Sequence, residues 1–156
     1  MFSRHVPLWV PVGGALLACS AGAVNAVGFL SISHAGLSHM SGNVTLLGIH
    51  VAESDWTVAR ATLALVLCFF AGSVVSGLII RRSTLRLGRR YSAALAVEAG
   101  LLVVAARLMV RDQWTGDYLA AAACGLQNAL ATSYSGAVIR TTHVTGMLTD
   151  FGIALG

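Results

Sequence analysis

A short sequence pattern occurs twice in this chain, each time at the edge of a long apolar run. Residues 39–48 read HMSGNVTLLG and residues 143–152 read HVTGMLTDFG, so a histidine, a small hydroxyl residue, a glycine, a threonine and a second glycine share one register. Upstream, residues 22–25 (GAVN) match residues 125–128 (GLQN), with an offset of one residue. An internal repeat in an apolar chain is typical of membrane transporters, whose binding sites lie where two related halves meet.

The composition places the chain in a lipid bilayer. Hydrophobic residues make up 56% of the sequence and the mean hydropathy is +0.79, whereas charged residues make up only 10%. A soluble domain carries about 25% charged residues, because its surface faces water. The charges here are too few to cover such a surface, and the composition therefore predicts an integral membrane protein.

Several apolar runs are long enough to cross a bilayer as helices, which requires about 20 residues each. Four such runs cover about residues 8–33, 56–80, 91–109 and 118–139. The second carries Gly72, Ser73, Ser76 and Gly77, a spacing of small residues that lets helices approach closely. Two shorter segments, about 42–52 and 146–156, follow the repeated motifs, and the first would rise only about 16 Å as a helix. We predict an all-α, polytopic helix bundle with four long spanning helices and two short motif helices.

The arginines predict the orientation of this bundle. All ten basic residues are Arg, and five of them lie within residues 81–90, between two apolar runs. Loops with such an excess stay on the cytoplasmic side, which places Glu53–Asp55 and Asp112–Asp117 outside. If segment 42–52 does not cross the membrane, Arg4 is also cytoplasmic and the two repeats are inverted; if it crosses, they are parallel. The position of Arg4 favours the inverted arrangement. Nucleic-acid binding is not expected from a basic cluster in this setting.

The repeat also predicts how a single membrane domain is organised. Residues 1–156 divide into a first repeat at about 8–81, a linking helix at about 91–111 and a truncated second repeat at about 118–156. In the first repeat a spanning helix follows the short segment, whereas no counterpart follows Gly156. We therefore expect that a final helix is lacking, that this chain alone does not transport, and that it is stable only as a homo-oligomer or with the missing segment restored.

The motifs and the intramembrane amides are the candidate substrate-binding residues. A small hydroxyl residue and a glycine at the start of a membrane helix leave backbone N–H groups free at the positive end of the helix dipole, which favours an anionic group. Ordinary helix capping by the hydroxyl is the alternative. The amides occupy related positions in the repeat, which indicates a shared cavity, although amides also join helices. The candidates are Asn25, His39, Ser41, Gly42, Asn43, Gln127, Asn128, His143, Thr145 and Gly146.

Two carboxyl groups are candidates for proton or cation coupling. Glu98 lies within the third apolar run, and Asp150 lies within the second short segment. An ionised carboxylate in the membrane is costly, so each should face the protein interior, pair or be protonated; structural hydrogen bonding is the alternative for both. His39 and His143 are further candidate proton acceptors. The spacing of the histidines matches no metal-ligand pattern, and we expect neither a metal nor a cofactor.

Three segments resemble one protein family. Residues 38–48 (SHMSGNVTLLG), 125–129 (GLQNA) and 142–146 (THVTG) are similar to the YoaK-like family of bacterial inner-membrane proteins. That family has no assigned function and is often described as small-molecule permeases. The resemblance covers nearly the whole chain, although Met147 stands where the family commonly has Asn. It implies a multi-pass protein of the bacterial inner membrane that carries an unidentified small molecule.

Two functions are therefore expected. A small-molecule transporter should bring the polar groups of the motifs together at a cavity between the repeats. A non-transporting scaffold or partner subunit should bury the same groups in contacts between helices, with no cavity. An enzyme is not expected, because the sequence has no P-loop, dinucleotide fingerprint, nucleophile elbow or HExxH motif.

Overall fold

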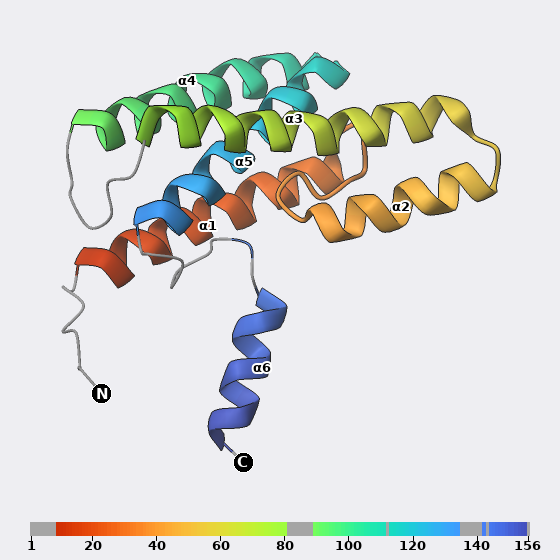
Figure 1. Cartoon of the computed structure of the whole chain (residues 1–156). Helices are drawn as coiled ribbons and strands as arrows, with labels where there is room; N and C mark the ends of the chain where they lie inside the picture. Colours follow the sequence, from red (N-terminus) through yellow and green to blue (C-terminus); the bar gives the residue numbers. More distant parts are fainter. Residues whose placement is uncertain (1–8, 81–88, 112, 135–141, 143, 156) are drawn as a thin grey trace.

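The computed structural model describes residues 9–80, 89–111, 113–134, 142 and 144–155. These residues are helical apart from short connections, and no strand occurs among them, in agreement with the all-α expectation (Figure 1). The helices, in chain order, are α1 (Trp9–Leu30), α2 (Met40–Ala52), α3 (Trp56–Ile80), α4 (Arg89–Met109), α5 (Trp114–Tyr134) and α6 (Val144–Leu155). Both repeated motifs thus lead into a helix, as their sequence predicts.

Helix α5 lies at the centre of the bundle. It packs against α3, α4 and α1, while α2 packs alongside α3 (Figure 1). Four consecutive alanines, Ala120–Ala123, favour the helix and keep it thin, so its neighbours come close. Two buried clusters surround its two halves. The first contains Ala35, Leu37, Leu65, Ala105, Ala120 and Ala121, and the second contains Ile80, Tyr91, Ala94, Leu126 and Leu130.

The backbones of α3 and α5 touch where the two helices cross. A Cβ atom added to Gly72 would overlap the carbonyl oxygen of Ala122, and one added to Gly125 would overlap the carbonyl oxygen of Phe69. The Ser73 hydroxyl donates a hydrogen bond to the Gly125 carbonyl at 3.0 Å. Contacts of this kind between small residues hold membrane helices together, since lipid provides no hydrophobic drive for helix association.

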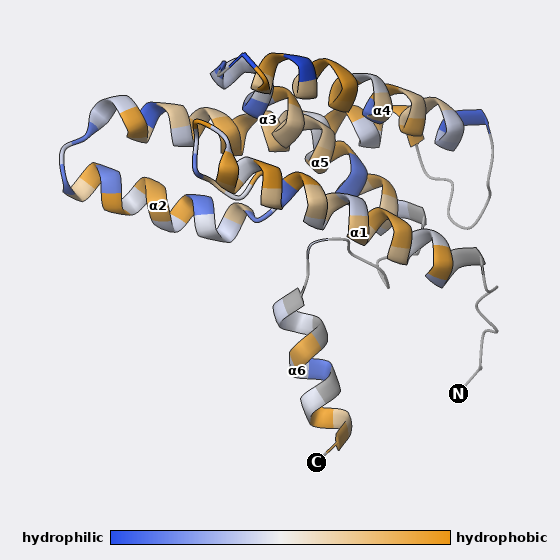
Figure 2. Ribbon diagram, turned by 180° about the vertical axis from the view of Figure 1, so that it is seen from behind, coloured by the Kyte–Doolittle hydropathy of each residue, from blue (hydrophilic) through white to orange (hydrophobic). Residues whose placement is uncertain are grey.

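Three helices in the described residues are long and apolar enough to cross a membrane, within residues 11–30, 56–80 and 89–109. The expected count of four is not confirmed, because α5 carries Asp117, Gln127 and Asn128 and is less apolar. Burial explains this difference, since a helix enclosed by others need not match lipid. The outer helices instead expose large apolar side chains, and most of the ribbon is hydrophobic (Figure 2). These side chains include Leu16, Phe29, Leu67, Phe70, Leu78 and Val103.

Helix α6 stands apart from the rest of the bundle (Figure 1). It packs against none of the other helices that the structure describes. Leu148, Ile153 and Leu155 are each at least 66% exposed, and Asp150 is exposed as well. The two motif helices therefore differ in their packing, because α2 runs along α3 and α6 has no such neighbour.

Candidate functional site

The first motif is joined to α1 by a chain of hydrogen bonds. The backbone N–H and the hydroxyl of Ser38 both donate to Asn25 Oδ1, each at 3.1 Å. His39 Nδ1 lies 3.2 Å from the same hydroxyl. Because the single hydroxyl hydrogen is directed at Asn25, the histidine must donate from Nδ1. Asn25, Ser38 and His39 therefore form one network that holds the loop between α1 and α2 against α1.

The start of α2 is not capped by the hydroxyl of Ser41. His39 is the N-cap residue of α2 and makes no side-chain capping hydrogen bond. Ser41 lies inside the first turn and is exposed, so the alternative in which Ser41 caps the helix is wrong. Gly42 is exposed too. The backbone N–H groups at this end of α2 are consequently not covered by a serine hydroxyl.

Asn43 faces the interior from the same turn. Its side chain is 1% exposed, and Nδ2 donates to the Gly36 carbonyl at 2.8 Å. Its Oδ1 atom is buried and has no hydrogen-bond partner among the described residues. Asn43 is thus the one predicted residue of the first motif that keeps an unused, buried polar atom. Leaving such an atom unpaired costs about 1–3 kcal/mol, which makes it a candidate contact for water or a ligand.

The second motif repeats one contact of the first. The Thr142 hydroxyl lies 3.4 Å from Asn128 Oδ1 and donates to it. Ser38 and Thr142 each directly precede a motif histidine, and each bonds the asparagine of the preceding long helix. Thr145 is exposed and Gly146 is half-buried. His143, a predicted site residue, lies outside the residues that the structure describes.

Glu98 and Gln127 form a buried pair between α4 and α5. Gln127 Nε2 donates to Glu98 Oε1 at 2.8 Å, and the two side chains are 2% and 5% exposed respectively. Glu98 Oε2 and Gln127 Oε1 have no partner among the described residues. The sequence marks these two residues for different roles, coupling and substrate binding, whereas the structure joins them into one polar site inside the bundle.

A third polar site was missed by the sequence analysis. Asp117, which the Arg cluster places in an outer loop, is fully buried in the first turn of α5. Its Oδ2 atom accepts a hydrogen bond from the Ser33 N–H at 3.2 Å and lies 2.9 Å from the Ser31 hydroxyl, whose one hydrogen it shares with the Gly28 carbonyl at 2.8 Å. Its Oδ1 atom has no partner among the described residues. An acidic residue at a helix start is usual, so its position alone gave no sign of burial.

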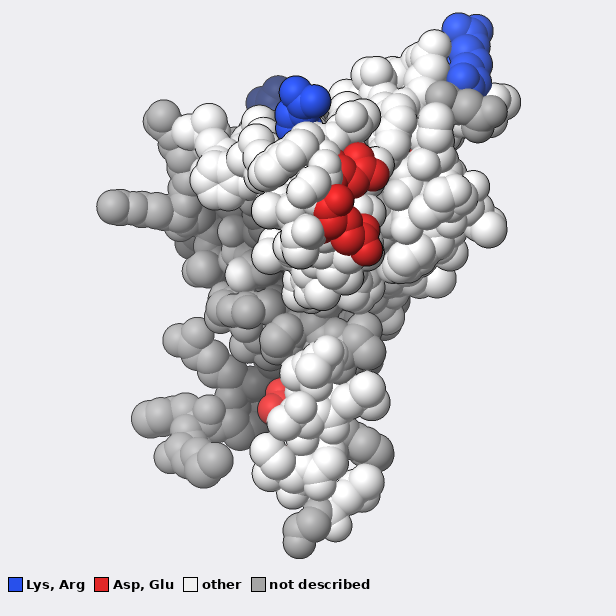
Figure 3. Space-filling view, turned by 90° about the vertical axis from the view of Figure 1, so that its right-hand side faces the viewer, with Lys and Arg blue, Asp and Glu red and all other residues white. Residues whose placement is uncertain are grey.

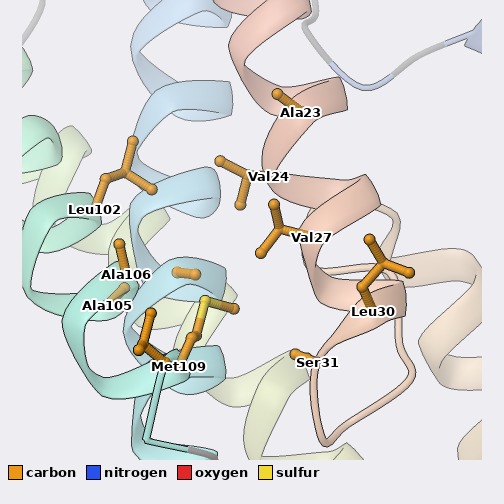
Figure 4. Close-up of a pocket in the computed structure, with 11 residues that line it drawn as sticks. Ala23, Val24, Val27, Leu30, Ser31, Leu102, Ala105, Ala106 and Met109 are labelled. Carbon is orange, nitrogen blue, oxygen red and sulfur yellow. The ribbon is translucent and has the colours of Figure 1, made fainter.

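The predicted residues do not converge on the cavity between α1 and α4. A cavity of about 500 Å³ lies between α1 and α4 and over α5 (Figure 4). Its lining is apolar except at Ser31, and none of the predicted site residues belongs to it. The lining residues are Ala23, Val24, Val27, Leu30, Ser31, Leu102, Ala105, Ala106, Met109, Val110 and Ala120. Within the described residues, no three His, Cys, Asp or Glu side chains gather as metal ligands would.

Replacing Asn25 with alanine is expected to loosen the loop between α1 and α2. The Ser38 N–H would lose its acceptor, and a hydrogen bond worth about 1.4 kcal/mol corresponds to a roughly tenfold faster exchange of that amide. Hydrogen-exchange mass spectrometry of residues 31–39 measures this change. The matched control is Asn128→Ala, which should leave the loop unchanged because Asn128 contacts Thr142 instead. Equal exchange in both variants would show that the Asn25 contact does not hold the loop.

Comparison with known proteins identifies the family. The chain matches the family described as "Protein of unknown function (DUF1275)" over residues 13–156. This protein belongs to that family. It is also 29% identical over 138 residues to a protein of Bacillus subtilis (strain 168) named "UPF0700 transmembrane protein YoaK". The alignment covers 85% of this chain and 61% of that relative, so the chain spans less than two-thirds of the relative's length. No solved structure matches the chain.

The family match and the apolar helices together establish a multi-pass membrane protein whose surface contacts lipid. They agree with the resemblance inferred from the three sequence segments.

Proposed function

We propose that this protein is a non-enzymatic membrane transporter of a small molecule, built from two inverted repeats. The observation that carries the proposal is the contact that occurs twice, Asn25 with Ser38 and Asn128 with Thr142. In each case a long helix presents an asparagine to the hydroxyl residue immediately before a motif histidine. A local structure that recurs in both halves supports a common origin of the two halves.

The directions of α1 and α5 support inversion of the repeats rather than a parallel arrangement. Ser31, just beyond the C-terminal end of α1, contacts Asp117 in the first turn of α5. The two helices therefore run antiparallel, and the two motif loops leave the bundle from opposite ends. Inverted repeats place related binding loops on either side of a central site, which is the basis of alternating access in many transporters.

The charges at the two ends of the bundle support one orientation. Helix α3 begins just after the exposed acidic residues Glu53 and Asp55, and acidic side chains gather on that end of the molecule, with basic side chains beside them (Figure 3). Arg60, Arg107 and Arg111 lie toward this end, whereas five Arg fall within residues 81–90, from the end of α3 to the start of α4. Exposed Arg89 and Arg90 begin α4 at the opposite end. Because basic residues mark the cytoplasmic side, we place the Arg end in the cytoplasm of a bacterium and the acidic turn outside. In this orientation α5 is a fourth crossing helix, shielded from lipid by α1, α3 and α4.

The coupling role falls to Glu98 in this proposal. Its carboxyl group is buried, holds one hydrogen bond from Gln127, and keeps one oxygen without a partner among the described residues. A carboxyl group in such a place exchanges a proton or binds a cation when its surroundings rearrange. Asp150 receives less support, because it is exposed on α6. The substrate-binding role stays with the amides and motif residues, of which Asn43 offers an unused buried oxygen.

A non-transporting scaffold or partner subunit is the second candidate, and a specific observation favours it. The hydrogen bonds of Asn25 and Ser38 are used within the protein, and the cavity between α1 and α4 is apolar. A scaffold would need only such hydrogen bonds between its own segments and no polar cavity, so transport has to be measured directly.

A liposome assay distinguishes the two functions. The full-length protein is reconstituted into vesicles that enclose a pH-sensitive dye, and pools of polar metabolites are added outside. We expect at least one pool to change the internal pH with the wild-type protein and not with Glu98→Gln. The matched control is Glu53→Gln, the same chemical change in the exposed turn before α3, which should retain the response. If no pool raises or lowers the internal pH with the wild-type protein, the scaffold is the better description.

A further inference from the structure

The cavity between α1 and α4 is apolar along its length and polar at one end. Val24 and Val27 of α1 point toward α4, where Leu102 and Ala106 face them (Figure 4). Buried Ala105 and Ala120 also line the cavity. Along α1 the lining extends from Ala23 to Ser31, which is roughly 12 Å at 1.5 Å per residue. The cavity therefore has the shape of a slot that lies parallel to the helices.

The polar residue at one end of the slot contacts a buried carboxyl group. Ser31 lines the cavity, and its hydroxyl lies 2.9 Å from Asp117 Oδ2. Asp117 is fully buried, yet its Oδ1 atom has no hydrogen-bond partner among the described residues, and no cationic side chain of those residues pairs with it. Ser31 and Ser33 supply only neutral hydrogen-bond donors. A buried carboxyl group that pairs with no cationic side chain favours a positively charged partner, since burying an unpaired charge is costly.

The mouth of the slot is rimmed by exposed apolar side chains. Helices α1 and α4 both contain candidate membrane spans, and the slot lies between them. Val27 at its rim is 49% exposed and Leu30 is 85% exposed, so apolar side chains surround the opening. A molecule that enters from the bilayer would lay an aliphatic chain along these residues and bring its head to the end near Ser31 and Asp117.

We propose that this slot binds an amphipathic molecule with an aliphatic chain and a cationic ammonium head. The chain would occupy the apolar part, where each buried CH₂ group adds to the binding free energy. The ammonium carries three donors and no acceptor, which complements the Ser31 hydroxyl oxygen at the end of the slot and the Asp117 carboxyl group that Ser31 contacts. This binding does not depend on transport, so its test and the liposome assay can fail separately.

The test titrates three probes of equal chain length, dodecylamine, dodecanol and dodecanoic acid, into the protein in phosphatidylcholine nanodiscs. The half-saturating concentration for the rise in Tm measures affinity. We expect dodecylamine to bind about tenfold or more tightly than the other two, because a charge-assisted hydrogen bond contributes about 1.5–3 kcal/mol. Asp117→Asn should reduce the affinity for the amine to that for the alcohol and leave the affinity for the alcohol unchanged.

Two alanine substitutions on α4 test the location. Ala106→Phe should fill the slot and lower the affinity for all three probes by about tenfold or more. Ala96 is an exposed alanine that does not line the slot, so Ala96→Phe should bind the probes as the wild type does. Equal binding by these two variants would overturn the site, and equal affinity of the wild type for all three probes would overturn the preference for a cationic head. Both comparisons stand whether or not Asp117→Asn folds.

Discussion

Replacing Gly72 with valine is expected to lower the Tm of the purified protein by about 10 °C. A Cβ atom at this position overlaps the carbonyl oxygen of Ala122 and comes within 3.0 Å of the Leu126 nitrogen, and both of these are backbone atoms of α5. Backbone cannot move aside as a flexible side chain can, so α3 and α5 must separate. Overpacking of this kind costs about 3 kcal/mol, and each kcal/mol corresponds to about 2–4 °C for a chain of this size.

Gly77→Val provides the matched control for the effect at Gly72. Gly77 lies on the same helix, is exposed, and would place its Cβ with no atom within 4 Å. The two substitutions change the helix propensity of α3 equally, so any difference between them comes from the contact with α5. Thermal unfolding in detergent, followed by circular dichroism, measures both. A similar Tm for the two variants would mean that α3 and α5 do not cross in contact at Gly72.

Replacing Gln127 with leucine is expected to destabilise the protein by about 1–3 kcal/mol. The substitution removes the only hydrogen bond to Glu98 that the described residues provide, and the glutamate then remains buried with both oxygens unpaired. The free-energy cost is that of desolvating a polar group without compensation. The change in Tm, or in the denaturant midpoint, measures this loss.

The double variant Glu98→Leu/Gln127→Leu should recover most of the stability lost by Gln127→Leu. Replacing both partners of a buried polar pair by apolar groups is often nearly neutral, because neither side is left unsatisfied. A double-mutant cycle should therefore give a coupling energy of about 1 kcal/mol or more. Strictly additive effects of the two single substitutions would show that Glu98 and Gln127 do not interact. The double variant also keeps a folded protein without the carboxyl group, which allows the coupling role of Glu98 to be tested separately from stability.

Much of the helical architecture could be predicted from local sequence. Apolar run length predicts α1, α3 and α4, because crossing a bilayer depends on composition and length within one segment. The repeated motif predicts that a helix begins at each of its copies, and α2 and α6 begin there. The spacing of small residues at Gly72, Ser73, Ser76 and Gly77 predicts close helix contact, and the structure shows which partner is involved: α5 touches α3 at Gly72 and Ser73.

The contacts among the polar residues depend on tertiary structure. Glu98 and Gln127 are 29 residues apart, and Ser31 and Asp117 are 86 residues apart, so no local pattern indicates either contact. Whether α5 can lie within the membrane also depends on its neighbours. A helix that carries Asp117 and Gln127 is stable there only when other helices shield these side chains from lipid. Packing alone decides which polar groups are buried, which are paired, and where a cavity remains between α1 and α4. The sequence thus determined the membrane environment and the positions of the helices through local composition, whereas the polar sites and the cavity arose from contacts between distant segments.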